Sequence, residues 1–109
     1  MLAELTRLSP TIVFIIGGPN SVSPAVEAAI EALPNNPSVT RISGEDRYEV
    51  SRNVATYEWY SSPSSTAYVA TGQKFPDALS GSAFGPRVDA ALFTVLGSCV
   101  PADTLAQIE

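Results

Sequence analysis

Residues 11–23 read TIVFIIGGPNSVS, and this stretch decides how the chain folds. Ile12 to Ile16 are apolar at every position instead of alternating with polar residues, so a strand covered on both faces is predicted here. Gly17 and Gly18 follow as a turn, and Ser23-Pro24 then supplies a helix start with proline at the first helical position. A covered strand, a glycine turn and a helix in this order predict a parallel α/β unit.

The same alternation of strand and helix continues along the chain. Further strands are predicted at residues 38–42, 67–70 and 90–95, the first of them near a sheet edge because it alternates and carries Arg41. Helices are predicted from residue 24 to 33, from about 46 to 57, and from 75 until Gly85-Pro86 ends the helix. The predicted fold class is α/β: a mostly parallel sheet of about four strands with helices on both faces, in one unit spanning residues 1–109.

A short helix of about two turns is predicted at each end of the chain. The first carries Leu2, Leu5 and Leu8 on one face, and the last opens at Pro101 with Leu105 and Ile108 pointing inward. Helices this short are marginal in isolation. We interpret them as parts of one helix in a repeating unit, and we expect their apolar stripes to favour association into a dimer or trimer.

The inventory of charges and reactive residues excludes several classes of function. A net charge of −5 argues against a nucleic-acid partner held by a basic face. The chain has no histidine, which removes the Ser-His-Asp and Cys-His nucleophile systems and the commonest metal ligand. The single cysteine, Cys99, is expected to be a small buried residue. No apolar run approaches the roughly 20 residues of a membrane span, and residues 1–4 have no signal-peptide features.

Candidate ligand-binding residues gather where the predicted strands end, because parallel α/β folds bind ligands at the carboxyl ends of their strands. They are Gly17, Gly18, Arg41, Gly44, Asp46, Arg47, Thr71, Gly72 and Asp77. Glycines let backbone N–H groups approach a ligand, and helix N-termini favour anions. Structural roles remain open for the glycines as turns and for the aspartates as helix caps, with Ser43 an alternative cap to Asp46.

Two residue groups near position 50 have competing interpretations. A cation at a helix start opposes the helix dipole, so Arg41 and Arg47 need a partner, either Asp46 and Asp77 or an anionic ligand. The aromatic residues are either a carbohydrate-stacking surface or the buried side of a helix, and burial is the prediction; they are Tyr48, Tyr57, Trp59 and Tyr60.

Three ordered blocks resemble the cell wall binding repeat 2 family. Residues 41–48, RISGEDRY, are similar to the opening of its repeat, R-x-x-G-x-D-R-Y. Residues 70–79, ATGQKFPDAL, match its second block without a gap, and residues 15–23, IIGGPNSVS, match its closing block. Residues 1–37 thus resemble the tail of one repeat and residues 38–109 most of the next. The chain departs from the family at the fourth strand, which reads AALF at residues 90–93, and at Ser51, where the family has threonine.

The resemblance implies a non-catalytic module that anchors a secreted or S-layer protein to the wall of a Gram-positive bacterium. Such repeats occur in tandem around a pseudo-threefold axis and bind anionic secondary polymers noncovalently, with no cofactor and no metal. The candidate residues above would then form the ligand-binding site, with arginine supplying local positive charge. The partners would be a teichoic-acid-like polymer or secondary polysaccharide, together with sister repeats or further copies of the chain.

Two other functions remain open from the residues alone. Asp46 and Asp77 at strand ends could hold a divalent cation in a phosphate- or nucleotide-handling α/β enzyme. The chain lacks the base or phosphate-loop lysine that such an enzyme uses. Alternatively, the motifs serve only to pack repeats against one another.

Overall fold

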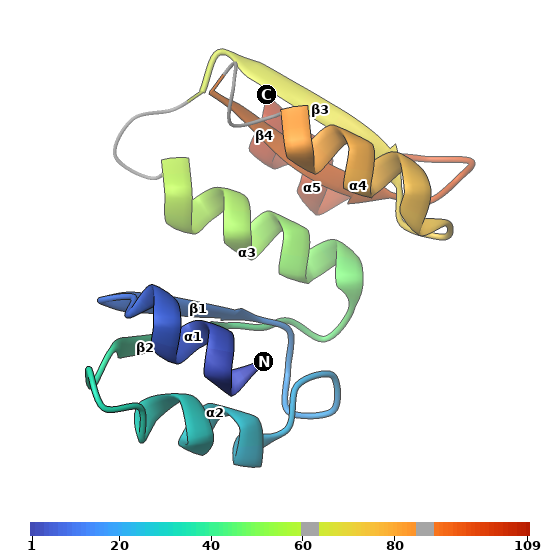
Figure 1. The fold of residues 1–109 in the computed structure, drawn as a ribbon. Coiled ribbons are helices and arrows are strands. Elements are labelled where there is room, and N and C mark those ends of the chain that lie inside the picture. Colours follow the sequence, from blue (N-terminus) through green and yellow to red (C-terminus); the bar gives the residue numbers. More distant parts are fainter. Residues whose placement is uncertain (60–63, 85–88) are drawn as a thin grey trace. The chain divides into compact units, whose positions relative to one another are not determined.

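Two strand–helix–strand units organise the chain in the computed structural model, which describes residues 1–59, 64–84 and 89–109 (Figure 1). The elements in chain order are α1 (Leu2–Leu8), β1 (Ile12–Ile16), α2 (Pro24–Glu31), β2 (Ser38–Ile42), α3 (Arg47–Trp59), β3 (Thr66–Thr71), α4 (Phe75–Phe84), β4 (Ala90–Val95) and α5 (Ala102–Ile108). They divide into unit 1, Met1–Ser43, and unit 2, Gly44–Glu109. Each predicted helix and strand is confirmed, whereas the predicted helix stop at Gly85-Pro86 lies outside the described residues.

The strands pair in parallel, as predicted, but they form two separate two-stranded sheets instead of one sheet of about four strands. In unit 1, Ile16 at the end of β1 is paired with Ile42 at the end of β2. In unit 2, Thr71 at the end of β3 is paired with Val95 at the end of β4. The carboxyl ends of each pair are therefore level, and the loops that follow the two strands start from the same edge.

A side chain of helix α3 binds the backbone of β4. The backbone N–H of Thr94 donates to Ser51 Oγ of α3 at 3.1 Å, and Thr94 Oγ1 donates to the same oxygen at 3.0 Å. This N–H is thus taken by a helix side chain and is not free to bind another strand.

Unit 1 has a one-sided core. Ile15, Ile30 and Leu33 are buried together, with partly buried side chains packed around them from Leu5, Val13, Val22, Val26 and Val39. Both helices of the unit therefore contribute to one cluster. The alternate residues of β1 are 43–56% exposed, namely Ile12, Phe14 and Ile16. The prediction that β1 is covered on both faces is wrong, because α1 and α2 both supply the Ile15 side.

Unit 2 has helices on both faces of its sheet, as predicted. Ala55 of α3 is buried with Ala91 and Phe93 of β4. On the other face, Gly81 of α4 approaches Leu92 so closely that an added Cβ would lie 3.0 Å from its Cδ1. Successive strand residues point to opposite faces, so α3 and α4 cover different sides of β4.

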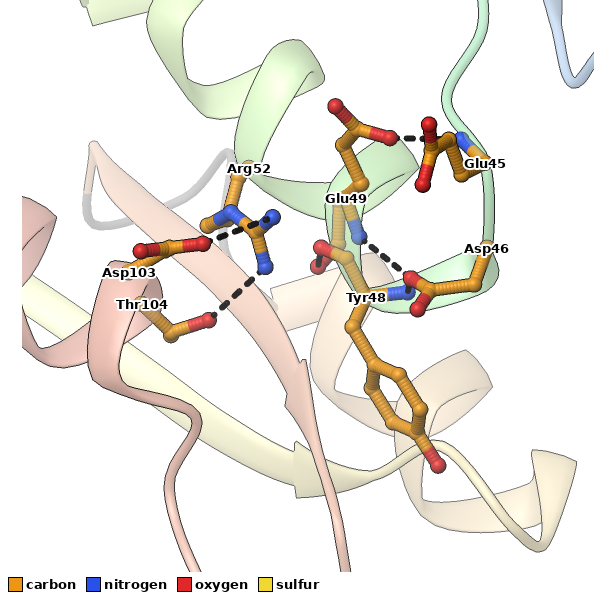
Figure 2. Close-up of polar contacts among 8 residues, drawn as sticks. Glu45, Asp46, Tyr48, Glu49, Arg52, Asp103 and Thr104 are labelled. Atoms are coloured by element: carbon orange, nitrogen blue, oxygen red, sulfur yellow. Dashed lines mark hydrogen bonds and ion pairs between the residues drawn. The ribbon is translucent and has the colours of Figure 1, made fainter.

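Polar contacts bind α5 to α3. Arg52 lies 3.8 Å from Asp103 in an ion pair and donates to Thr104 Oγ1 at 3.4 Å, as Figure 2 shows. Gln107 Nε2 donates to Thr56 Oγ1 at 2.9 Å. Thr104 is fully buried, whereas Leu105 and Ile108, which were expected to point inward, are 47% and 38% exposed.

Two further predictions about burial are wrong. Cys99 lies exposed in the loop between β4 and α5, because no helix or strand holds it against the core. Tyr57 on α3 is 54% exposed, so this helix does not bury all of its aromatic residues. Tyr60 lies outside the described residues. Among the described residues, no helix has both the length and the apolar character that a membrane crossing requires.

Replacing Ser51 with alanine is expected to lower the free energy of unfolding by about 1–2 kcal/mol, because the Thr94 N–H loses its acceptor. Threonine at the same position keeps the hydroxyl and serves as the matched control, with a change below about 0.5 kcal/mol. Urea unfolding, followed by the fluorescence of the only tryptophan, Trp59 of α3, measures both. Equal losses for alanine and threonine would show that the hydroxyl does not hold the strand.

Candidate ligand-binding site

The first turn of α3 is built by a helix cap centred on Asp46. Its Oδ1 accepts the backbone N–H groups of Tyr48 and Glu49, both at 2.8 Å. The Glu49 carboxylate accepts the N–H of Glu45 at 2.5 Å, as Figure 2 shows. Of the two caps that the sequence allows, Asp46 is therefore the one used. Glu49 has the spacing of a capping box, but it accepts the N–H of the residue before the cap. One oxygen of the Asp46 carboxylate is committed to the helix.

Gly44 lets the chain turn closely into this cap. A Cβ at Gly44 would lie 2.9 Å from Glu49 Cβ and 2.9 Å from the backbone nitrogen of Val50. Because the backbone nitrogen cannot rotate away, only glycine fits without moving the helix start. Gly44 is thus explained by packing against α3, independently of any ligand.

The start of α3 is fastened to the carboxyl ends of β3 and β4. Arg47 Nη1 donates to the carbonyl of Gly72 at 2.6 Å, and the Arg47 carbonyl accepts from Thr94 Oγ1 at 3.1 Å. The N–H of Gly72 donates to the carbonyl of Val95 at 2.8 Å. The Tyr48 ring extends from α3 towards this turn (Figure 2), and a Cβ at Gly72 would lie 2.7 Å from Tyr48 Cε1. Helix α3 and the ends of β3 and β4 therefore meet at one edge of unit 2.

The positive charge of Arg47 is not paired with a carboxylate among the residues that the structure describes. The residue is exposed, and among residues 1–59, 64–84 and 89–109 the carbonyl of Gly72 alone accepts a hydrogen bond from its guanidinium. No carboxylate of this part of the chain forms an ion pair with it. The expected pairing of Arg47 with Asp46 or Asp77 does not occur there: Asp46 caps α3, and Asp77 lies exposed in the first turn of α4. Thr71 Oγ1 accepts the N–H of Gln73, which shapes the loop between β3 and α4.

Arg41 has a different environment, in unit 1. Its Nη1 donates to the carbonyl of Gly17 at 2.8 Å, while Nε and Nη2 donate to Glu27 Oε2 at 3.1 and 2.9 Å. Its side chain is only 15% exposed. The partner that the sequence requires for Arg41 is therefore Glu27 of α2, a residue that sequence analysis did not single out. The carbonyl of Gly18 accepts the N–H groups of Ser21 and Val22, which closes the turn after β1.

The nine predicted site residues thus belong to two groups. Gly17, Gly18 and Arg41 lie in unit 1, and Gly44, Asp46, Arg47, Thr71, Gly72 and Asp77 lie in unit 2. Within unit 2, direct contacts join Arg47 to Gly72, whereas Asp77 has no hydrogen bond or ion pair to either residue among the described residues. Sequence analysis missed the hydroxyls of Ser51 and Thr94, which fix α3 against β4. The departure of Ser51 from the family pattern was the only signal that pointed to one of them.

Unit 2 also contains a cavity of about 350 Å³ at the opposite end of its strands. Its walls combine apolar and uncharged polar side chains, namely Ala55, Ala67, Ala91, Phe93 and Ile108 with Thr56, Ser64, Ser65, Thr66 and Gln107. No charged side chain lines it, so it is unsuited to an anion. Among the described residues, no group of three or more acidic or cysteine side chains is placed to hold a metal ion.

Comparison with known proteins defines the class of protein to which this chain belongs. Residues 41–107, more than half of the chain, match the Cell wall binding domain 2 (CWB2) family. The chain therefore belongs to this family, which confirms the resemblance, and the motifs at residues 41–48 and 70–79 lie within the match.

Individual relatives agree with this assignment. The solved structure of Cwp6 from Clostridium difficile superimposes with a TM-score of 0.81 at 31% identity, over 96% of this chain and 16% of that one. N-acetylmuramoyl-L-alanine amidase LytC of Bacillus subtilis is 32% identical over 83% of this chain and 16% of its own length. The amidase enhancer of the same organism is 36% identical over 70% of this chain and 10% of its own. The chain thus spans no more than about a sixth of these relatives.

Proposed function

We propose that this chain is a non-catalytic module that anchors a secreted or surface protein to a Gram-positive cell wall. It binds noncovalently, through an anionic wall polymer of the teichoic-acid or secondary-polysaccharide type. Membership of a cell wall binding family supports a ligand that is part of the cell wall. Most of the length of the amidase relative lies outside the region matched here, which supports a division between anchoring and catalytic parts.

The exposed guanidinium of Arg47 is the observation that carries the choice of an anionic ligand. The first turn of a helix is already positive, and a cation placed there is locally unfavourable. The Gly72 carbonyl occupies one guanidinium nitrogen, and the rest of the fork can bind a carboxylate or phosphate with two parallel hydrogen bonds. An acidic protein can thus bind an acidic polymer through local positive charge. No observation favours the cation-dependent enzyme, because Asp46 is engaged in capping α3.

The assembly and its context are part of the same proposal. Residues 1–37 correspond to the tail of one repeat and residues 38–109 to most of its successor, as the order of the three motifs predicts. The parent protein then carries tandem repeats and is an S-layer protein or a wall enzyme. In isolation we expect the chain to form a dimer or trimer, because Leu2, Leu8, Leu105 and Ile108 leave apolar surface on the end helices.

Binding to walls tests the proposal. Purified Gram-positive walls stripped of protein are expected to retain the chain. Extraction of their anionic polymers is expected to abolish retention. Replacing Arg47 with glutamine should weaken binding about 10-fold or more, the value of one charge-assisted hydrogen bond. Arg7→Gln is the control, because Arg7 of α1 is equally a surface arginine but already pairs with Glu4. A tandem fusion of three copies raises the effective concentration where one copy binds weakly. Equal binding of this fusion to extracted and intact walls would contradict the proposal.

A further inference from the structure

The two strand–helix–strand units have the same hydrogen-bond arrangement around the glycine that follows their first strand. Gly17 follows β1 and Gly72 follows β3. Each donates its N–H, at 2.8 Å, to the carbonyl of the last residue of the partner strand, Ile42 or Val95. Each also accepts a hydrogen bond on its own carbonyl from an arginine Nη1, at 2.8 Å in unit 1 and 2.6 Å in unit 2. The glycine turn is therefore held from both sides in both units.

The two arginines differ in what occupies the rest of the guanidinium. In unit 1, Glu27 Oε2 accepts from both Nε and Nη2 of Arg41. The side chains of this pair are 15% and 29% exposed, so the charge of Arg41 is balanced in a largely enclosed position. In unit 2, no described carboxylate takes the same place on Arg47, which is exposed. The charge of Arg41 is thus neutralised by Glu27, whereas Arg47 presents its positive charge to the solvent.

We infer that Arg41 is a positioning residue for wall binding, whereas Arg47 contacts the anionic ligand. This inference rests on the proposed function and assigns different roles in it to the two arginines. Arg41 and Glu27 together hold the Gly17–Gly18 turn, where Gly17 has a φ of 118° that other residues rarely adopt. Glu27 occupies the guanidinium edge that an external carboxylate or phosphate would use. Arg41 therefore adds to affinity by fixing the turn and adds no charge to the contact.

The salt dependence of binding separates these two roles. A polyanion releases condensed counterions for each cation that contacts it. Each contacting cation therefore makes the logarithm of the association constant fall more steeply with the logarithm of the salt concentration. The probe is the anionic polymer fraction released by mild acid from Gram-positive walls. Its affinity for the chain is measured between about 50 and 200 mM NaCl. Arg47→Gln is expected to weaken binding and to reduce the slope by about one. Arg41→Gln is expected to weaken binding with the slope unchanged.

Two further variants keep the test decisive if Arg41→Gln folds poorly. Arg41→Lys keeps the charge but loses the fork that joins Gly17 to Glu27, so it is expected to behave like Arg41→Gln. If Arg41 touched the polymer, lysine would restore the slope. Glu27→Gln removes the internal anion at constant size. A positioning role predicts weaker binding, because the turn loosens, whereas a contact role predicts tighter binding, because a competitor is removed.

The outcomes distinguish this inference from the proposal on which it depends. If the wild-type chain binds the polymer and Arg41→Gln flattens the slope as Arg47→Gln does, the positioning role is overturned and the anchoring function stands. Tighter binding by Glu27→Gln leads to the same conclusion. If the wild-type chain does not bind the polymer at any of these salt concentrations, the anchoring function itself fails and the division of roles falls with it.

Discussion

Replacing Phe93 with alanine is expected to lower the free energy of unfolding of unit 2 by about 3–5 kcal/mol. Phe93 is 4% exposed, and the buried residues that cluster with it are the alanines Ala55 and Ala91. Among the residues that the structure describes, the phenyl ring is thus the one large side chain of that buried cluster. It also lines the 350 Å³ cavity, so its removal widens a hollow that its alanine neighbours are too small to fill. The melting temperature should fall by more than about 12 °C, as measured by Trp59 fluorescence.

Val69 provides the matched control for Phe93. It is the register partner of Phe93 on β3 and lies on the same face of the sheet, but it is 50% exposed. Val69→Ala is therefore expected to cost less than about 1 kcal/mol. A loss below 1 kcal/mol for Phe93→Ala as well would mean that the core of unit 2 lies elsewhere.

Gly72→Ala is expected to destabilise unit 2 by about 2 kcal/mol and to displace the start of α3. The added Cβ would lie 2.7 Å from Tyr48 Cε1, 3.2 Å from Arg47 Cδ and 3.3 Å from Thr94 Cβ. Three side chains from two elements crowd this position, so relief by a single rotation is not available. Because Arg47 depends on the Gly72 carbonyl, the same change should also weaken wall binding.

A second glycine and a double variant isolate the cause. A Cβ at Gly97 would lie 3.1 Å from Gln73 Oε1 and 3.9 Å from Gln73 Cδ, and the end of this flexible side chain can move. Gly97→Ala is thus expected to change stability by less than about 0.5 kcal/mol. In a Tyr48→Ala background, Gly72→Ala should cost at least about 1 kcal/mol less than in the wild type. Additive losses would show that Tyr48 is not the obstructing group.

The sequence was sufficient for features that depend on neighbours along the chain. Proline at the start of α2, the Asp46 and Glu49 spacing at α3 and the apolar runs of the strands each act within a few residues. The helices and strands were therefore predictable, as was the parallel pairing that short strand–helix–strand connections impose. The family was predictable because its three motifs occur in order.

Features that depend on distant residues were not predictable from these patterns. The Arg41–Glu27 pair joins a strand to a helix 14 positions earlier, and nothing in the local spacing singles out Glu27. The attachment of α3 to β4 uses the hydroxyl of Ser51, which accepts the N–H of Thr94, 43 positions away. Apolar runs indicate that a strand can be covered, but the placement of α1 and α2 decides whether it is. This explains the error at the Ile12 face of β1.

The register of the two sheets also has a kinetic consequence. Ile12 pairs with Ser38 and Thr66 pairs with Ala90, so each sheet forms only after a loop of about 25 residues has closed. Each loop contains one helix, α2 or α4, which can form in microseconds or less and shortens the distance that the strands must search. Local helix formation followed by a single closure suits a module whose two halves have separate buried clusters. Each half can then reach its native pairing without waiting for the other, so we expect the two strand pairs to form independently during folding.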